Sequence, residues 1–210
     1  MIMNEQKLIA LSCADFAQRL SSASPTPGGG GASALVGSIG AALGFMVGAL
    51  TIGKPKYADV EPNLKILMER ADALRTALLK CVDDDAAAFA PLAKAYSIPK
   101  EDPNRESIME RCLRDAAAVP MRILELSCEA IELQREFAAK GSALAVSDAA
   151  TGVVFCRSAM YGAAVNVKVN TKAMKDRSFA EDMNKHVDEL MERYRPIADL
   201  VYEDVYRRYC

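Results

Sequence analysis

Carboxylates in apolar surroundings are the side chains of this sequence best suited to proton transfer. Asp148 lies within a stretch of alanine, leucine and valine, and a second alanine-rich segment contains Asp83, Asp84 and Asp85. An ionised carboxylate is costly in such a setting unless it is paired or faces a cleft. On a helix the three consecutive aspartates point about 100° apart, so at most two can face one cleft. The alternatives are a helix N-cap at Ser147 and Asp148 and a solvated helix face for residues 83–85.

Two further pairs of polar residues could contact a ligand. Lys54 and Lys56 follow a long uncharged segment, where they could receive an anionic group or serve as exposed cations at the end of a helix. Asn166 and Asn170 are one helical turn apart, so they could bond a heterocycle or cross-link two helices. Both alternatives stay open for each pair.

A glycine-rich stretch precedes the longest uncharged run. Residues 24–31 contain two prolines and four glycines, and no charged residue follows until Lys54. We predict a turn through Gly31 that leads into a buried helix beginning at Ala32. The start of a helix exposes free N–H groups and the positive end of the helix dipole, which suits an anionic or carbonyl-bearing ligand. The alternative is an ordinary loop followed by a core helix.

The uncharged run also fits the length of a membrane span. Residues 32–52 approach the roughly 20 residues needed to cross a bilayer, and Gly40, Gly44 and Gly48 recur at the spacing that lets helices pack closely in membranes. The flanks lack an aromatic belt, and the chain has no second long uncharged segment. We therefore expect no membrane contact, and a helix buried all round inside a bundle or a dimer.

Apolar residues recur at helical spacing through most of the chain, and no alternating pattern indicates strands. The predicted fold is all-α, a bundle of long helices around the Gly/Ala-rich central helix, in one domain of residues 1–210. Pro91 is expected to kink one helix, and Pro120 interrupts the apolar stripe of another. The expected helices cover residues 4–20 with a break near 12–15, 32–52, 62–96, 103–140, 143–169 and 176–206.

Composition excludes several classes of function. The net charge is −2 without long blocks of like charge, so we predict no binding to nucleic acid. His186 is the only histidine and the six cysteines form no CxxC pair, so we predict neither a metal site nor a Ser–His catalytic pair. Residues 1–11 lack the pattern of a signal peptide. With unpaired cysteines, these features favour a cytoplasmic protein.

Five motifs, in order along the chain, resemble the cyclodeaminase/cyclohydrolase family that acts on folates. The resemblance runs from about residue 20 to residue 176, and the Pro-Thr-Pro-Gly-Gly-Gly motif is its most specific part. It implies an all-helical homodimer that binds a tetrahydrofolate derivative near the glycine-rich stretch, with no metal or nucleotide cofactor. The motifs lie at residues 22–30, residues 50–54 with Tyr57, residues 83–89, residues 147–148 and residues 162–170.

The resemblance implies a one-carbon enzyme that converts 5,10-methenyltetrahydrofolate and water to 10-formyltetrahydrofolate. The first alternative is a cyclodeaminase that releases ammonia from formiminotetrahydrofolate. Relatives commonly carry asparagine near the positions of Ser142 and Leu144, so the second alternative is an inactive folate-binding or helical interaction protein.

Both reactions pass through a tetrahedral adduct and need one group to accept a proton and one to deliver it. We predict Asp148 as the leading acid/base, with Asp85 or Asp83 as its partner. Lys54 is the candidate for the glutamate tail of the folate, whether single or polyglutamylated. The other predicted substrate-binding residues are Pro27, Gly28, Gly29, Gly30, Asn166 and Asn170.

Overall fold

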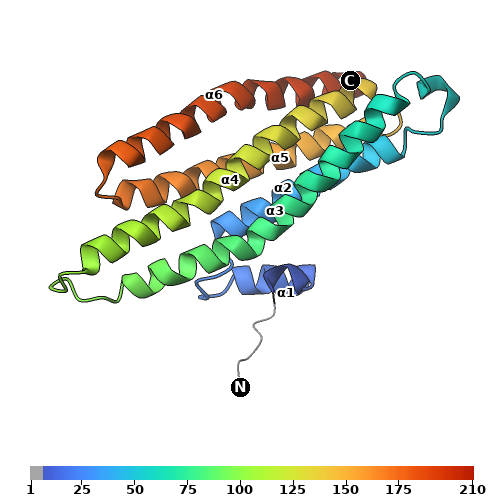
Figure 1. The fold of residues 1–210 in the computed structure, drawn as a ribbon. Coiled ribbons are helices and arrows are strands. Elements are labelled where there is room, and N and C mark those ends of the chain that lie inside the picture. Colours follow the sequence, from blue (N-terminus) through green and yellow to red (C-terminus); the bar gives the residue numbers. More distant parts are fainter. Residues whose placement is uncertain (1–6) are drawn as a thin grey trace.

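The computed structural model describes residues 7–210, and every regular element in that range is helical, so the predicted fold class is confirmed. Five long helices lie along one another, and the short helix α1 lies against one side of them (Figure 1). The helices are α1 (Cys13–Leu20), α2 (Gly29–Ala49), α3 (Glu61–Ala95), α4 (Arg105–Lys140), α5 (Val146–Ala173) and α6 (Arg177–Tyr206), with short 3-10 helices at Leu8–Ala10, Pro55–Tyr57 and Arg207–Tyr209.

Helix α2, predicted as the central helix, packs against α3, α4 and α5, whereas α4 contacts all four other long helices. The glycines of α2 allow its neighbours to approach its backbone. A Cβ atom at Gly40 would lie 2.6 Å from Sγ of Cys156, and a Cβ atom at Gly44 would lie 2.7 Å from Nε2 of Gln134. Both distances are shorter than atoms can approach, so the small residues of α2 are required by close helix packing.

Helix α2 is also the one helix of residues 7–210 that is long and apolar enough to cross a membrane. Half of its most apolar stretch is buried inside the bundle, as in a core helix. The opposite side is open, because Ile39 is 44% exposed and Leu50 is 48% exposed. Burial all round within the bundle of one chain is therefore wrong, since no helix of residues 7–210 covers this side, and burial in a dimer stays a prediction.

The glycine-rich stretch differs from its prediction. Helix α2 begins at Gly29 rather than Ala32, so Gly29 and Gly30 belong to its first turn. Gly28 is the N-cap, and its carbonyl oxygen accepts the N–H of Ala32 at 3.0 Å. The turn predicted through Gly31 is thus confined to residues before Gly28. Close packing of the first turn against neighbouring side chains outweighs the weak helix propensity of glycine.

The start of the chain follows the prediction where it is described. Residues 4–6 of the expected first helix lie outside the described residues. The expected break falls at Ser12, whose Oγ caps α1 by accepting the N–H of Asp15 at 3.1 Å.

Helix α5 also begins close to its expected position, but with a different cap. Its N-cap is Ala145, and Asp148 is the third residue of the first turn. The alternative in which Ser147 and Asp148 form the N-cap is therefore wrong. An acidic residue in the first turn still interacts favourably with the helix dipole.

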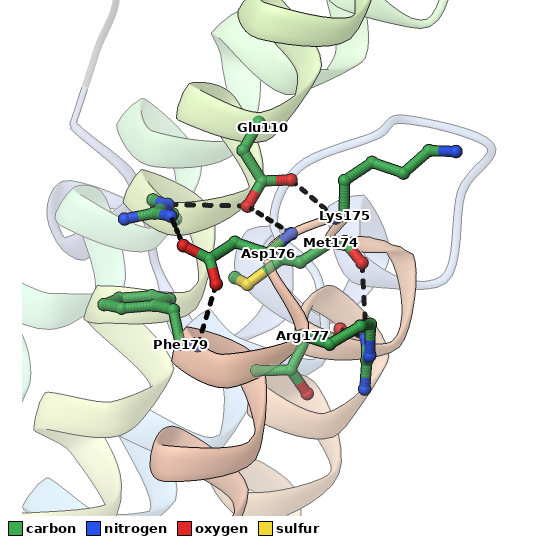
Figure 2. Close-up of polar contacts among 8 residues, drawn as sticks. Glu110, Met174, Lys175, Asp176, Arg177 and Phe179 are labelled. Atoms are coloured by element: carbon green, nitrogen blue, oxygen red, sulfur yellow. Dashed lines mark hydrogen bonds and ion pairs between the residues drawn. The ribbon is translucent and has the colours of Figure 1, made fainter.

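The connection between α5 and α6 is fixed by a group of charged residues (Figure 2). The carboxylate of Glu110 accepts the N–H groups of Lys175 at 2.7 Å and Asp176 at 3.3 Å. Asp176 caps α6 by accepting the N–H of Phe179 at 3.1 Å, and it also pairs with Arg114. These bonds hold the end of α5 against α4 and confirm the predicted start of the last helix.

Candidate active site

A cavity of about 230 Å³ lies at the start of α2, where α3, α4 and α5 also meet. Its walls combine a carboxylate, two side-chain amides and glycine backbone with apolar side chains. These are the kinds of group that orient a small polar heterocycle. The lining residues are Pro25, Thr26, Gly28, Gly29, Gly30, Asp85, Phe89, Ala116, Pro120, Asn166, Val169 and Asn170.

Asp85 is the carboxylate of this cavity. Its Oδ2 accepts the N–H of Gly31 at 2.8 Å, which ties α3 to the first turn of α2. Burial raises the pKa of Asp85, and the bond from Gly31, which favours the ionised form, offsets only part of that effect. A carboxylate with a raised pKa in a cleft is suited to acid–base catalysis near neutral pH.

The first turn of α2, which lies directly against Asp85, supplies hydrogen-bond donors. No acceptor among residues 7–210 bonds to the N–H groups of Gly29 and Gly30. These groups lie at the positive end of the helix dipole. The predicted glycines Gly28, Gly29 and Gly30 all line the cavity. Pro27 does not, because its ring is buried beneath the turn.

Asn166 and Asn170 lie on the α5 side of the cavity. The amide of Asn166 donates to the carbonyl oxygen of Gly162 at 2.8 Å. The amide of Asn170 donates to the carbonyl oxygens of Ala116 at 3.0 Å and of Asn166 at 3.1 Å. The predicted cross-link between helices is confirmed for Asn170, which joins α5 to α4; Asn170 also lines the cavity, and its contact with a heterocycle stays a prediction.

The neighbouring aspartates serve other contacts. Oδ1 of Asp83 accepts the N–H of Leu8 at 2.6 Å and so anchors the start of the described chain. Asp84 pairs with Lys80 on the surface. Of the three consecutive aspartates, only Asp85 lines the cavity, because a helix turns them in three directions.

Asp148 and Lys54 lie at the other end of the bundle. Nζ of Lys54 donates to Oγ of Ser142 at 3.1 Å, and the N–H of Ser142 donates to Thr51, just beyond the end of α2, at 2.8 Å. Asp148 precedes Asn166 by 18 residues of α5. At 1.5 Å per residue this places the two about 27 Å apart along the helix. The predicted pairing of Asp148 with Asp85 or Asp83 is therefore not formed within one chain.

Tyr57 belongs to this second group. Its hydroxyl oxygen accepts the N–H of Ala143 at 3.2 Å. That bond, a bond with Ser142 and the nearby charges of Lys56 and Lys54 lower the pKa of Tyr57. The end of α2 and the start of α5 thus form a basic, polar corner.

A second cavity of about 460 Å³ adjoins the first and shares Pro25, Thr26 and Phe89 with it. Lys7 and Arg19 line this second cavity, and neither residue was predicted to contact a ligand. Among residues 7–210, no three histidine, cysteine, aspartate or glutamate side chains lie close enough to hold a metal ion.

The helical bundle and its cavity define a protein with a carboxylate-containing cleft at a helix N-terminus. Residues 12–189 match the family model described as formiminotransferase-cyclodeaminase, so the chain belongs to the formiminotransferase-cyclodeaminase family. The resemblance seen in the sequence motifs is thereby confirmed.

Particular relatives extend this assignment. The chain is 39% identical over 194 residues to the methenyltetrahydrofolate cyclohydrolase of Methylorubrum extorquens, covering 90% of this chain and 93% of the relative. It is 31% identical to the formimidoyltransferase-cyclodeaminase of Mus musculus over 94% of this chain, but spans only 37% of that protein. The crystal structure of formiminotetrahydrofolate cyclodeaminase from Thermotoga maritima superposes with a TM-score of 0.88 at 26% identity, covering 96% of this chain and 98% of that one.

Proposed function

We propose that this protein is a 5,10-methenyltetrahydrofolate cyclohydrolase that forms 10-formyltetrahydrofolate. The observation that carries this proposal is the 39% identity to a cyclohydrolase over nearly the full length of both chains. The cavity at the start of α2 supplies chemistry that suits the reaction, because it holds one partly buried carboxylate beside the N–H groups of a helix N-terminus.

Asp85 is the proposed base. The methenyl substrate is a cation, and its charge favours the ionised form of a nearby carboxylate even though burial raises the pKa of Asp85 in the free protein. Water attacks the methenyl carbon and transfers a proton to Asp85. The bond from that carbon to N5 then breaks, the hydroxyl group loses its proton as the formyl carbonyl forms, and Asp85 returns a proton to N5. One proton is released overall.

The first turn of α2 is proposed to bind the oxygen of the one-carbon unit. This oxygen gains negative charge as the adduct forms and collapses. Preorganised N–H groups aimed at developing charge lower the barrier to reaction. The free N–H groups of Gly29 and Gly30 are such donors.

We also propose a homodimer that completes the site. The cavity of about 230 Å³ is smaller than sites that enclose a whole drug-sized ligand. The open side of α2 is uncharged and exposes Ile39 and Leu50. Antiparallel pairing of two copies through this side places the start of one α2 beside the end of the other. Lys54 and Asp148 of a second copy then approach Asp85, with Lys54 available for the glutamate tail.

A cyclodeaminase is the second candidate, favoured by the structural likeness to the Thermotoga maritima enzyme. In that reaction N10 attacks the formimino carbon and ammonia leaves, so the same site would serve. An inactive protein is the third candidate. Ser142 and Leu144 stand near positions where relatives commonly carry asparagine. Ser142 accepts a hydrogen bond from Lys54, so a change at this position affects the surroundings of Lys54, whereas Leu144 is 89% exposed.

Absorbance of 5,10-methenyltetrahydrofolate distinguishes the three candidates. Purified protein is offered methenyltetrahydrofolate and, separately, formiminotetrahydrofolate, with the Asp85→Asn variant as control. A cyclohydrolase consumes the methenyl absorbance, a cyclodeaminase generates it, and an inactive protein changes neither. We expect consumption that Asp85→Asn slows by roughly 10²-fold or more. The proposed site uses no metal or nucleotide cofactor, so dialysis against a chelator should leave the rate unchanged. We also propose a cytoplasmic location.

A further inference from the structure

A proline inside α4 creates an unusual acceptor beside the cavity. Pro120 is buried within the helix and has no N–H, so the carbonyl oxygen of Ala116, four residues earlier, lacks its helical donor. The amide of Asn170 on α5 supplies that donor at 3.0 Å. A side chain of one helix thus replaces a missing backbone bond of another.

This bond determines the orientation of the side-chain amide of Asn170, which lines the cavity. A side-chain amide has two N–H donors, and those of Asn170 bond to the carbonyl oxygens of Ala116 and Asn166. Turning the amide over would place its oxygen against two carbonyl oxygens. Oδ1 of Asn170 is therefore fixed as an acceptor, and no donor among residues 7–210 bonds to it.

The cavity consequently combines acceptors with donors. Asp85 and Asn170 line it with acceptor oxygens, whereas Asn166 has an amide oxygen and also a second N–H beside the one that bonds to Gly162. The first turn of α2 offers the N–H groups of Gly29 and Gly30. A planar ring with N–H donors along one edge and a carbonyl oxygen elsewhere complements this arrangement.

We propose that Pro120 positions Asn170 as the acceptor that recognises the N–H edge of a bound heterocycle. The inference rests on the proposed function, in which that edge carries the 2-amino group and N3–H of the pterin ring. Pro120 acts as a positioning residue, because it leaves the Ala116 carbonyl oxygen free to accept the amide of Asn170 and so sets the orientation of that amide.

Binding of tetrahydrofolate and of its 2-desamino analogue, measured by fluorescence titration, tests this proposal. The analogue lacks the amino donor, so the wild type should bind it about tenfold more weakly, the effect of losing one hydrogen bond. Asn170→Ala removes the acceptor, and its two dissociation constants should agree within about twofold.

Pro120→Ala provides a variant that keeps the fold. The new N–H can bond to the Ala116 carbonyl within α4, which releases the Asn170 amide to turn. The preference for tetrahydrofolate should fall severalfold while the melting temperature stays at or above that of the wild type. Pro196→Ala is the matched control, because Pro196 is an exposed proline inside α6, and it should leave the preference unchanged.

Each other outcome overturns a specific statement. Equal binding of the two compounds by the wild type, with methenyl consumption intact, overturns this inference alone. A tenfold preference that survives Asn170→Ala does the same. Binding of neither compound by the wild type overturns the inference and the proposed function together.

Discussion

A Cβ atom at Gly30 would lie 2.2 Å from Oδ1 of Asp85, so the carboxylate occupies the space that the side chain of any other residue would need. Gly30 is buried in the first turn of α2, and the neighbouring Gly31 donates its N–H to the same carboxylate. The position of Asp85 therefore depends on a residue without a side chain on another helix.

Gly30→Ala is expected to displace Asp85 and lower turnover by about a hundredfold, because misplacing a reacting group by about 1 Å has effects of this size. Steady-state kinetics of methenyl consumption provide the measurement. Gly31→Ala is the matched control in the same turn, since its Cβ would lie at ordinary distances, 3.4 Å from the carbonyl oxygen of Val82 and 3.7 Å from Oδ2 of Asp85. Equal losses in the two variants would contradict the steric explanation.

Asp85→Asn is expected to remove activity while stabilising the fold at neutral pH. Burial raises the pKa of Asp85, so the folded state holds this proton more tightly than the unfolded state does. Wild-type stability therefore falls as pH rises from the unfolded pKa, about 3.9, through the raised folded pKa. Asparagine does not ionise, so the variant does not lose stability in this way as pH rises. Its melting temperature should exceed that of the wild type at pH 7.5, and the difference should shrink on acidification. A difference that grows toward low pH would indicate that the carboxylate stabilises the fold.

Mixed dimers test whether two copies share one site. Asp85→Asn and Asp148→Asn homodimers should each be inactive if the site uses Asp85 from one copy and Asp148 from the other. Unfolding and refolding an equal mixture should then recover about a quarter of the wild-type rate, because half of the dimers carry one intact site. No recovery, or an active Asp148→Asn homodimer, would remove Asp148 of the second copy from the mechanism.

The corner between α5 and α6 is expected to support the cavity at a distance. Asp176→Ala removes the carboxylate that caps α6 (Figure 2) and its ion pair with Arg114, and it keeps the backbone N–H that Glu110 accepts. Because Asn170 lies near this end of α5, we expect a lower melting temperature and weaker folate binding. The pKa of Asp176 is lowered, chiefly by the N–H of Phe179, so its contribution is present above its unfolded pKa and is lost as pH falls through the lower folded pKa. Calorimetry at several pH values measures this dependence. Asp72→Ala, in an exposed pair with Arg75, is the control that should leave both properties unchanged.

The long helices were predictable because apolar residues recur with the helical period over many turns. The start of α2 was not predictable in the same way. Glycine has low helix propensity, so residues 29–31 indicate a turn when the chain is considered alone. Contact with Asp85 and with Asn166, whose Nδ2 would lie 3.1 Å from a Cβ at Gly29, explains why these residues are helical.

The site was predictable in part. The sequence singled out Asp85, Asn166 and Asn170, but it could not separate Asp85 from Asp83, because packing decides which side of α3 faces α2. The bond between Asn170 and Ala116 was missed. A proline within a helix leaves a carbonyl without its helical donor, and the Ala116 carbonyl belongs to a buried residue, so Pro120 was a signal that a polar side chain would approach Ala116.

The glycine contacts along α2 also fix how far apart two shared sites would be. Gly40 and Gly44 hold the backbone of α2 against α5 and α4, so the helix cannot slide along its neighbours. In the proposed antiparallel pair, one site lies at each end of the paired helices. The 21 residues of α2 then separate the two sites by about 30 Å, the length of the helix, so the two bound substrates do not touch each other.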